Sequence, residues 1–172
     1  MNESKKETDA LDDIVAQWQK ELSEIDAAPM AVFGRLKRCV LLGEHRIESV
    51  FEQYGLCRPA FDVLATLRRS GSPYCLTPTA LFNSMMITSG TLTTRLQRME
   101  AEGLISRLPN PNDARSMLVQ LTDSGKELVE KVVYPHVENE KRILSALSED
   151  QQQQLNEGLT ALLKVLETLD KG

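Results

Sequence analysis

The chain has 172 residues, which favours a single domain, and hydrophobic residues make up 41% of it, which excludes a wholly disordered protein. Its formal net charge is −5, yet residues 31–121 carry eleven basic and seven acidic side chains, while the segments on either side are acidic. Because the local field governs the attraction of a polyanion, the total charge does not exclude nucleic acid as a partner.

Cysteine usage and hydropathy bear on the compartment. The three cysteines, Cys39, Cys57 and Cys75, are far apart and form no CxxC pair. The N-terminal stretch lacks the apolar segment of a secretion signal, and no run approaches the length of a transmembrane helix. We therefore expect a cytoplasmic protein without a membrane partner, in which each cysteine is a small buried hydrophobe.

Three helices are predicted in the first 71 residues. Residues 9–25 place apolar side chains at helical spacing, namely Leu11, Ile14, Val15, Trp18 and Leu22. A longer helix is predicted over residues 30–54, with Phe33, Leu36, Val40, Ile47, Val50 and Phe51 on its apolar side. A third begins near Pro59 and ends at Gly71, and residues 72–76 are long enough only for a loop or a single-pair strand.

Two short helices, at about residues 78–85 and 89–102, predict a helix-turn-helix. Thr77 precedes the first as its N-cap. In the second, Leu92, Leu96 and Met99 face the core, and Gly90 allows close approach of its backbone. The other faces expose hydroxyl, amide and guanidinium groups, on Ser89, Thr91, Thr93, Thr94, Arg95, Gln97 and Arg98.

These side chains are of the types that a DNA groove accepts. Hydroxyl groups reach phosphates, threonine methyls contact thymine methyls, and arginine or glutamine pairs with base edges. Together with Thr77 they make up the DNA-binding residues predicted on the two helices. The same pattern is also compatible with a polar surface helix that binds nothing.

A hairpin over residues 105–121 favours the DNA-binding interpretation. Its tip contains Asn110, Pro111 and Asn112, which are typical turn residues. Directly after a recognition-type helix, such a ribbon is the wing of a winged helix, and it carries Arg115 toward the minor groove or a phosphate. Asp113 is repelled by DNA, so we expect it to position Arg115 or an arginine of the recognition helix.

The rest of the chain is predicted to form two long amphipathic helices, at about residues 123–146 and 149–169. Thr122 or Ser124 is expected to cap the first of these helices, and Ser148 the second. Their apolar stripes, like that of residues 30–54, need a partner surface.

The segment "MEAEGLISRLPNPNDARSMLVQLTDSGKEL" resembles the signature of the MarR family, a D-x-R wing followed by L-T-x-x-G. The match rests on Gly103, Leu104, Asp113, Arg115, Leu121, Thr122 and Gly125. The resemblance extends from residue 30 onward. One departure is Ala114, where close relatives often carry a second arginine.

The resemblance implies a bacterial transcription regulator with a mainly α fold and a small β-hairpin wing. Residues 58–121 would form the winged helix-turn-helix, and residues 29–57 with 122–172 a helical dimerisation region. Residues 1–28 would form an extra N-terminal helix. A homodimer of this kind would place its two recognition helices in successive major grooves, about 34 Å apart, on a pseudo-palindromic duplex.

Within the family the chain is similar to the urate-responsive, PecS-like branch, on "DIVAQWQKE", "PMAVFGRLKR", "FDVLATLRRSGSPY" and "HVENEKRILS". This similarity implies a ligand site formed by Trp18, Asp62, Arg69 and Arg107. An anionic purine needs a cation for its charge, an acceptor for ring N–H groups and a flat apolar lid, which Arg69, Asp62 and Trp18 provide. If Arg107 also binds the ligand, the ligand acts on the strand that follows the recognition helix.

Other roles remain open for these residues. Trp18 is compatible with plain packing, Asp62 with an ordinary ion pair to Arg58 or Arg69, and Arg107 with a phosphate contact. His45 and His136 are too isolated for a metal site, and His136 near a dimer interface would make the response depend on pH.

The sequence thus predicts a ligand-responsive regulator, in our interpretation a repressor, that is released from DNA by a small aromatic anion such as urate. No cofactor, metal or catalytic constellation is expected, so the chain is not an enzyme. The alternatives are a MarR-type regulator that senses oxidants through a cysteine or binds phenolic compounds, and a winged-helix protein-interaction module without a DNA function.

Overall fold

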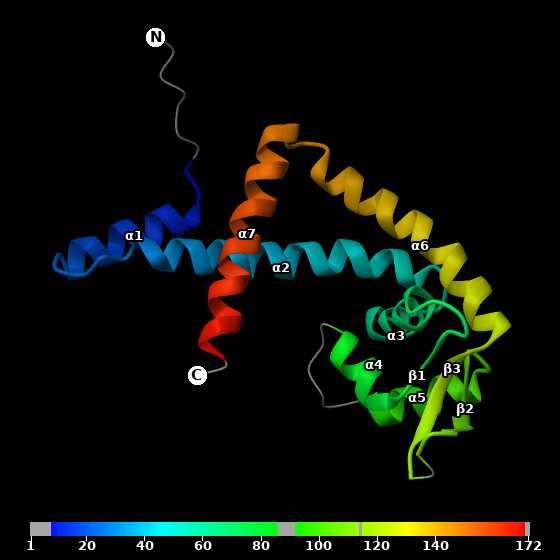
Figure 1. Cartoon of the computed structure of the whole chain (residues 1–172). Coiled ribbons are helices and arrows are strands. Elements are labelled where there is room, and N and C mark those ends of the chain that lie inside the picture. Colours follow the sequence, from blue (N-terminus) through cyan, green and yellow to red (C-terminus); the bar gives the residue numbers. More distant parts are fainter. Residues whose placement is uncertain (1–7, 86–91, 114, 171–172) are drawn as a thin grey trace. The chain divides into compact units, whose positions relative to one another are not determined.

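The computed structural model describes residues 8–85, 92–113 and 115–170, and Figure 1 shows the course of the chain. It divides into two compact units, Met1–Ser49 and Val50–Gly172, each of which is described by itself. The prediction of a mainly helical chain with a small β-hairpin is confirmed. Among the described residues, no helix has the length and apolarity needed to cross a membrane.

The first unit contains α1 (Ala10–Glu21) and most of α2 (Ala28–Glu52). The Asp9 carboxylate caps α1 and also accepts two hydrogen bonds from the Arg35 guanidinium, at 2.8 and 3.0 Å. Close packing fixes the register, because a Cβ on Gly34 would lie 2.4 Å from Leu11 Cδ1. The helix predicted over residues 9–25 is shorter than expected and ends at Glu21, since the chain turns before α2 begins at Ala28.

The second unit combines the other helices with one small sheet. Its elements, from the end of α2 onward, are α3 (Arg58–Arg69), β1 (Cys75–Leu76), α4 (Pro78–Ser84), α5 (Leu92–Ala101), β2 (Ile105–Pro109), β3 (Met117–Leu121), α6 (Asp123–Leu144) and α7 (Glu149–Leu169). The three strands are antiparallel in the order β1-β3-β2. Strand β1 forms two residue pairs with β3, Cys75 with Gln120 and Leu76 with Val119, one more than the sequence suggested.

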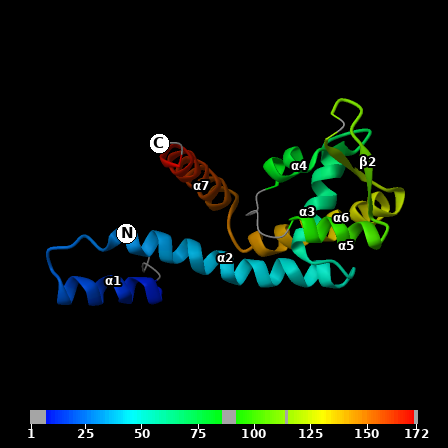
Figure 2. The same ribbon diagram turned by 90° about the horizontal axis from the view of Figure 1, so that it is seen from below.

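The core of this unit joins helices and sheet. Leu64 and Leu67 of α3 are fully buried, as are Leu81 of α4, Met99 of α5 and Val119 of β3. Helix α6 packs along α3 (Figure 2) and contributes the buried Val129 and Val132. The small sheet and the paired helices therefore hold α4, α5 and the wing in one body.

Helix α6 ends at Leu144, two residues earlier than predicted, and it contains Pro135, which lies within the helix predicted over residues 123–146. Ser148 caps α7 as expected, in a reciprocal capping box with Gln151. In this single chain α7 has no buried residue. Its exposed large apolar side chains are Leu155, Leu159, Leu163, Val165, Leu166 and Leu169.

Candidate nucleic-acid interface and effector site

Helix α5 has two distinct faces. The predicted inward residues Leu96 and Met99 are 3% and 1% exposed, and they anchor the helix to the core. Thr93, Thr94 and Gln97 are exposed on its other sides. The remaining predicted contacts at its start, Ser89, Gly90 and Thr91, lie outside the described residues.

The two arginines of α5 differ in their surroundings. The Arg98 side chain is 79% exposed, and its Nε donates to Glu102 Oε1 at 2.8 Å, a contact that raises the pKa of the guanidinium. An exposed pair one helical turn apart is weakly coupled, so this guanidinium is able to exchange Glu102 for a phosphate. Arg95 is half-buried, and its positive charge acts on Asp62 of α3.

Thr77 precedes this pair of helices. Its hydroxyl oxygen accepts a hydrogen bond from the Ala80 N–H at 3.1 Å and caps α4, as predicted. The side chain is half-buried. A hydroxyl group accepts and donates at once, so the capping role leaves its hydrogen for another acceptor.

The wing tip is built by short side chains that bond to the backbone. The Asn110 side chain donates to Ser116 Oγ at 2.7 Å and accepts from the Asn112 N–H at 3.0 Å. Asp113 Oδ1 accepts from the Arg115 backbone N–H at 2.9 Å, which gives the expected wing-positioning role a geometric basis through the backbone. Arg115 itself is exposed at this tip.

A joint at the base of the wing ties the hairpin to α6. Thr122 caps α6 through Gly125 N–H at 3.0 Å, and the Thr122 hydroxyl hydrogen points to the carbonyl oxygens of Gly103 and Leu104, at 2.7 and 2.9 Å. A Cβ at position 125 would lie 2.1 Å from the Leu104 carbonyl oxygen, so only glycine fits. The L-T-x-x-G motif thus has a structural role that its sequence did not reveal.

Asp62 lies in the middle of α3, half-buried. Burial raises the pKa of its carboxyl group, and the charges of Arg58, His136, Arg95 and Arg69 act in the opposite direction. A carboxylate that is partly withdrawn from water and surrounded by cations is a hydrogen-bond acceptor for N–H groups of a ligand.

Arg69 and Arg107, the two predicted cationic ligands, differ in their contacts. Arg69 Nη2 donates to Thr66 Oγ1 at 3.2 Å and to the Ser84 carbonyl oxygen. Arg107 Nε lies 3.3 Å from Glu100 Oε2, while its Nε and Nη2 atoms are buried without a hydrogen-bond partner among the described residues. Arg107 therefore has donors available to a polar ligand.

Trp18 is carried by α1 in the first unit, whereas the other three predicted ligand residues lie in the second. The indole is 42% exposed. Since α1 contains no buried residue, plain packing within this unit does not enclose Trp18.

The expectation of buried cysteines is wrong for two of the three. Cys39 on α2 and Cys57, the N-cap residue before α3, are exposed, and Cys75 is half-buried. Burial raises the pKa of the Cys75 thiol, which disfavours the reactive thiolate at this position.

Histidine and acidic side chains are the usual ligands of a metal ion. Within the described residues, no group of three or more His, Cys, Asp or Glu side chains is placed to hold a metal ion. His136 lies against the rings of Phe51 and Phe61, with centroids 5.0 and 5.1 Å away, and its Nε2 is 3.5 Å from Glu140 Oε1.

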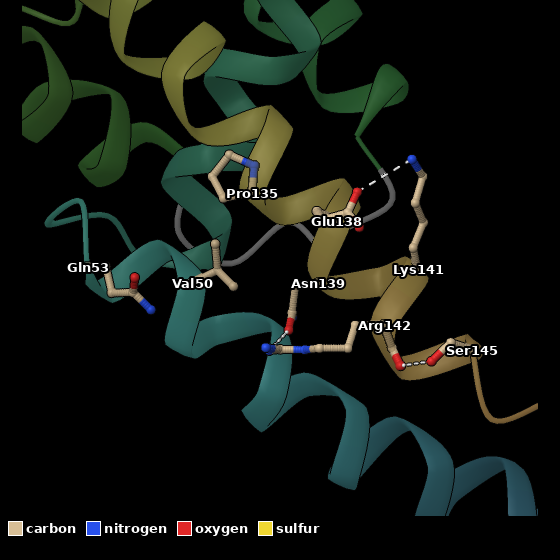
Figure 3. A pocket seen from close by; sticks show the side chains of 8 residues that line it. All are labelled: Val50, Gln53, Pro135, Glu138, Asn139, Lys141, Arg142 and Ser145. Carbon is tan, nitrogen blue, oxygen red and sulfur yellow. Dashed lines mark hydrogen bonds and ion pairs between the residues drawn. The ribbon is translucent and has the colours of Figure 1, made fainter.

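A hollow of about 570 Å³ lies beside α6 near Pro135 (Figure 3). Its two cations are already engaged, since Arg142 donates to Asn139 Oδ1 at 2.8 Å and Lys141 lies 3.5 Å from Glu138 Oε2. No predicted ligand residue lines it, and nothing in the sequence pattern predicted it.

The family model and the similar proteins all point to the same family. The MarR family model matches residues 56–117. The HTH-type transcriptional regulator PecS of Dickeya dadantii is 46% identical over 143 residues, which cover 83% of this chain and 86% of PecS.

Two solved structures with DNA share the fold. A cysteine-to-serine variant of E. coli MarR in complex with operator DNA is 26% identical with a TM-score of 0.67, over 85% of this chain and 97% of that one. The S. aureus MepR–DNA complex is 25% identical with a TM-score of 0.68, over 77% and 97%. The predicted winged helix-turn-helix is thereby confirmed.

Proposed function

The chain belongs to the MarR family of transcription regulators, and we propose that it acts as a homodimeric repressor that a small aromatic anion such as urate releases from duplex DNA. Like its relatives, it is a transcription regulator and not an enzyme. The observation that carries the proposal is the polar face of α5, anchored by Leu96 and Met99 beside a wing that exposes Arg115.

Side-chain chemistry and the related structures both support DNA binding by α5 and the wing. Hydroxyl, amide and guanidinium groups on α5 suit the major groove, and Arg115 suits a phosphate or the minor groove. MarR and MepR, which share the fold, have been solved with DNA. The same reasoning assigns DNA contacts at Ser89, Gly90 and Thr91.

A homodimer is supported by the apolar side chains that a single chain leaves exposed. On α2 they include Phe33, Val40 and Leu41, which are 55%, 55% and 60% exposed, and on α7 Leu159 and Leu166. Leucines that recur along one side of a helix are typical of a helix that packs against a partner. A twofold axis then presents two copies of α5 to a pseudo-palindromic site.

The effector proposal rests on complementary chemistry. Arg107 carries buried donors that have no hydrogen-bond partner among the described residues. Asp62 is an acceptor on which several cations act, and Arg69 supplies a second guanidinium on the same helix as Asp62. Trp18 offers an aromatic surface. These are the kinds of group that an anionic purine such as urate requires, and phenolic acids share its anionic and flat character.

Oxidant sensing is the second candidate, because Cys39 and Cys57 are exposed. Replacing all three cysteines by serine decides between the two inputs. A variant that keeps its response to urate and has none to peroxide supports the anion. A wild-type protein that leaves DNA on peroxide treatment, while the triple variant does not, supports the thiol.

Salt dependence tests the DNA function itself. We expect the affinity for duplex DNA from upstream of its own gene to fall steeply between 50 and 200 mM salt, as counterion release requires (about 10³-fold or more for six phosphate contacts). A winged-helix interaction module without a DNA function shows no binding at any salt concentration, and that result contradicts the proposal.

Urate binding has a direct optical signal. Trp18 is the only tryptophan of the chain, so tryptophan emission, excited selectively over the three tyrosines, reports on α1 alone. We expect urate to quench this emission saturably, and Arg107→Gln to shift the midpoint to higher urate, with an unchanged spectrum of the free protein as the control. Linear, unsaturable quenching counts against the site.

A further inference from the structure

The guanidinium of Arg69 closes the C-terminal end of α4. Arg69 is the last residue of α3, and its Nη2 donates to the carbonyl oxygen of Ser84, the last residue of α4. The final carbonyl groups of a helix have no partner within it, and a basic side chain there satisfies them and complements the helix dipole. Arg69 is therefore a C-terminal cap supplied by a neighbouring helix.

The same nitrogen atom has a second acceptor. Nη2 carries two hydrogens. It donates to the Ser84 carbonyl oxygen and also, at 3.2 Å, to Oγ1 of Thr66, a residue that is only 4% exposed. Thr66 belongs to α3, one turn before Arg69. Two fixed acceptors thus hold the guanidinium against both helices.

A guanidinium presents parallel N–H pairs on two edges only, Nε with Nη2 and Nη1 with Nη2. Both edges include Nη2, so an anion that pairs with Arg69 in a bidentate manner requires the nitrogen that caps α4. Such an anion and the Ser84 carbonyl group compete for the same hydrogens.

We propose that Arg69 is a positioning residue for DNA binding, and that an anionic effector weakens DNA affinity by drawing its guanidinium away from the C-terminal end of α4. This inference rests on the proposed effector function and adds the means by which ligand and DNA site are coupled. Helix α4 ends at Ser84 and the recognition helix α5 begins at Leu92. The first helix of a helix-turn-helix positions the second, so we expect a displaced last turn of α4 to shift α5.

The proposal differs from a purely ligand-binding role in one measurable way. If Arg69 only binds the anion, Arg69→Met keeps full DNA affinity and merely loses the response. If Arg69 also caps α4, the variant resembles the effector-bound state without any effector present. We expect its DNA affinity to fall by the factor that saturating urate produces in the wild type, about 5- to 150-fold, with no further loss on adding urate.

Arg68→Met is the matched control. It removes the same group from the neighbouring position, where Arg68 Nε donates instead to Glu130 Oε1 of α6, at 2.7 Å. We expect Arg68→Met to retain both DNA affinity and release by urate. An equal loss in both variants, or wild-type affinity in Arg69→Met, overturns the cap.

Hydrogen exchange tests the same mechanism in the wild-type protein, so the result does not depend on whether a variant folds. Urate should speed amide exchange in the last turn of α4, residues 81–84, while exchange in the core of α3 stays unchanged. Release of DNA by urate with unaltered or slower exchange in that turn contradicts the mechanism. Failure of urate to release DNA contradicts the effector proposal instead, and the DNA affinity of Arg69→Met still decides whether the cap positions α5.

Discussion

Asp62 is a charged group at a place where charge is costly. It is half-buried on α3, and desolvation raises the pKa of its carboxyl group despite the cations nearby. The folded chain therefore binds a proton at this site more tightly than the unfolded chain, and the ionised form destabilises the fold. That cost is understandable if the carboxylate serves to accept hydrogen bonds from a ligand.

Asp62→Asn should make the protein more stable at neutral pH and less responsive to urate. For a raised carboxyl pKa, stability falls as pH rises from the ordinary value of 3.8 through the folded value, so the gain from asparagine is present above that window and vanishes below it. Urea unfolding of both proteins at pH 7 and pH 4 measures the gain. A variant that is less stable than wild type at pH 7 contradicts this reasoning.

Arg115 is predicted to act through its charge and its fork-shaped donors. Arg115→Ala should weaken DNA binding and reduce the slope of log affinity against log salt by about one. Arg115→Lys is the matched control, because it keeps the charge and hence the salt slope while losing bidentate geometry. Anisotropy titrations at four salt concentrations give both slopes, and an unchanged slope in Arg115→Ala removes the wing from the interface.

At the scale of elements, the joint between the wing and α6 depends on a glycine. A Cβ at Gly125 meets the Leu104 carbonyl oxygen at 2.1 Å, whereas a Cβ at Gly158 in α7 has nothing within 4 Å. Backbone cannot move aside as a flexible side chain can, so the joint has to open to admit a methyl group.

Gly125→Ala should destabilise the protein by about 1–3 kcal/mol, as overpacking does, and should weaken DNA binding because the wing loses its anchor on α6. Gly158→Ala should instead stabilise α7 by about 0.5–1 kcal/mol, since alanine is the better helix former. Chemical unfolding of the two variants beside the wild type measures both changes. Equal effects of the two substitutions rule out the close contact as the cause.

The elements that the sequence predicted correctly are those specified by local patterns. The spacing of Leu96 and Met99 identified the buried face of α5, and the hydroxyls of Thr77 and Ser148 marked helix starts that the structure confirms. Turn residues around Asn110 located the hairpin. Each signal arises within a few residues of the chain.

Features that depend on contacts between distant segments could not be predicted from the sequence. The approach of Gly125 to Leu104 and the bond from Arg69 to Ser84 are set by packing, and nothing in the local sequence marks them. The exposure of Cys39 and Cys57 was mispredicted for the same reason, because a cysteine is apolar by type and only tertiary packing decides whether it is buried. The end of α1 at Glu21 reflects a turn that the apolar periodicity does not encode.

At the scale of the whole molecule, dimerisation decides whether two copies of α5 reach one DNA site. Leu155, Leu159, Leu163, Leu166 and Leu169 recur every three to four residues along α7 and are exposed in the single chain. Such a stripe is stable in water only when another surface covers it.

Leu159→Glu should shift the protein toward monomers, because it inserts a charge into the apolar stripe, and DNA affinity should fall with the dimer. Lys164→Glu is the matched control. Successive helix residues are rotated by about 100°, so position 164 lies on the side of α7 away from the apolar stripe, and the same carboxylate there should leave the dimer intact. Sedimentation velocity over a range of protein concentrations distinguishes them. A dimeric Leu159→Glu protein places the interface elsewhere.

Control of DNA binding by an aromatic anion, as proposed for this MarR-family protein, is open to one titration. Anisotropy of labelled duplex from upstream of its own gene is followed at fixed salt and protein concentration while urate is added. We expect tight initial binding and a saturable loss of anisotropy, which shifts to higher urate in Arg107→Gln. Tight binding that urate leaves unchanged at every concentration contradicts it.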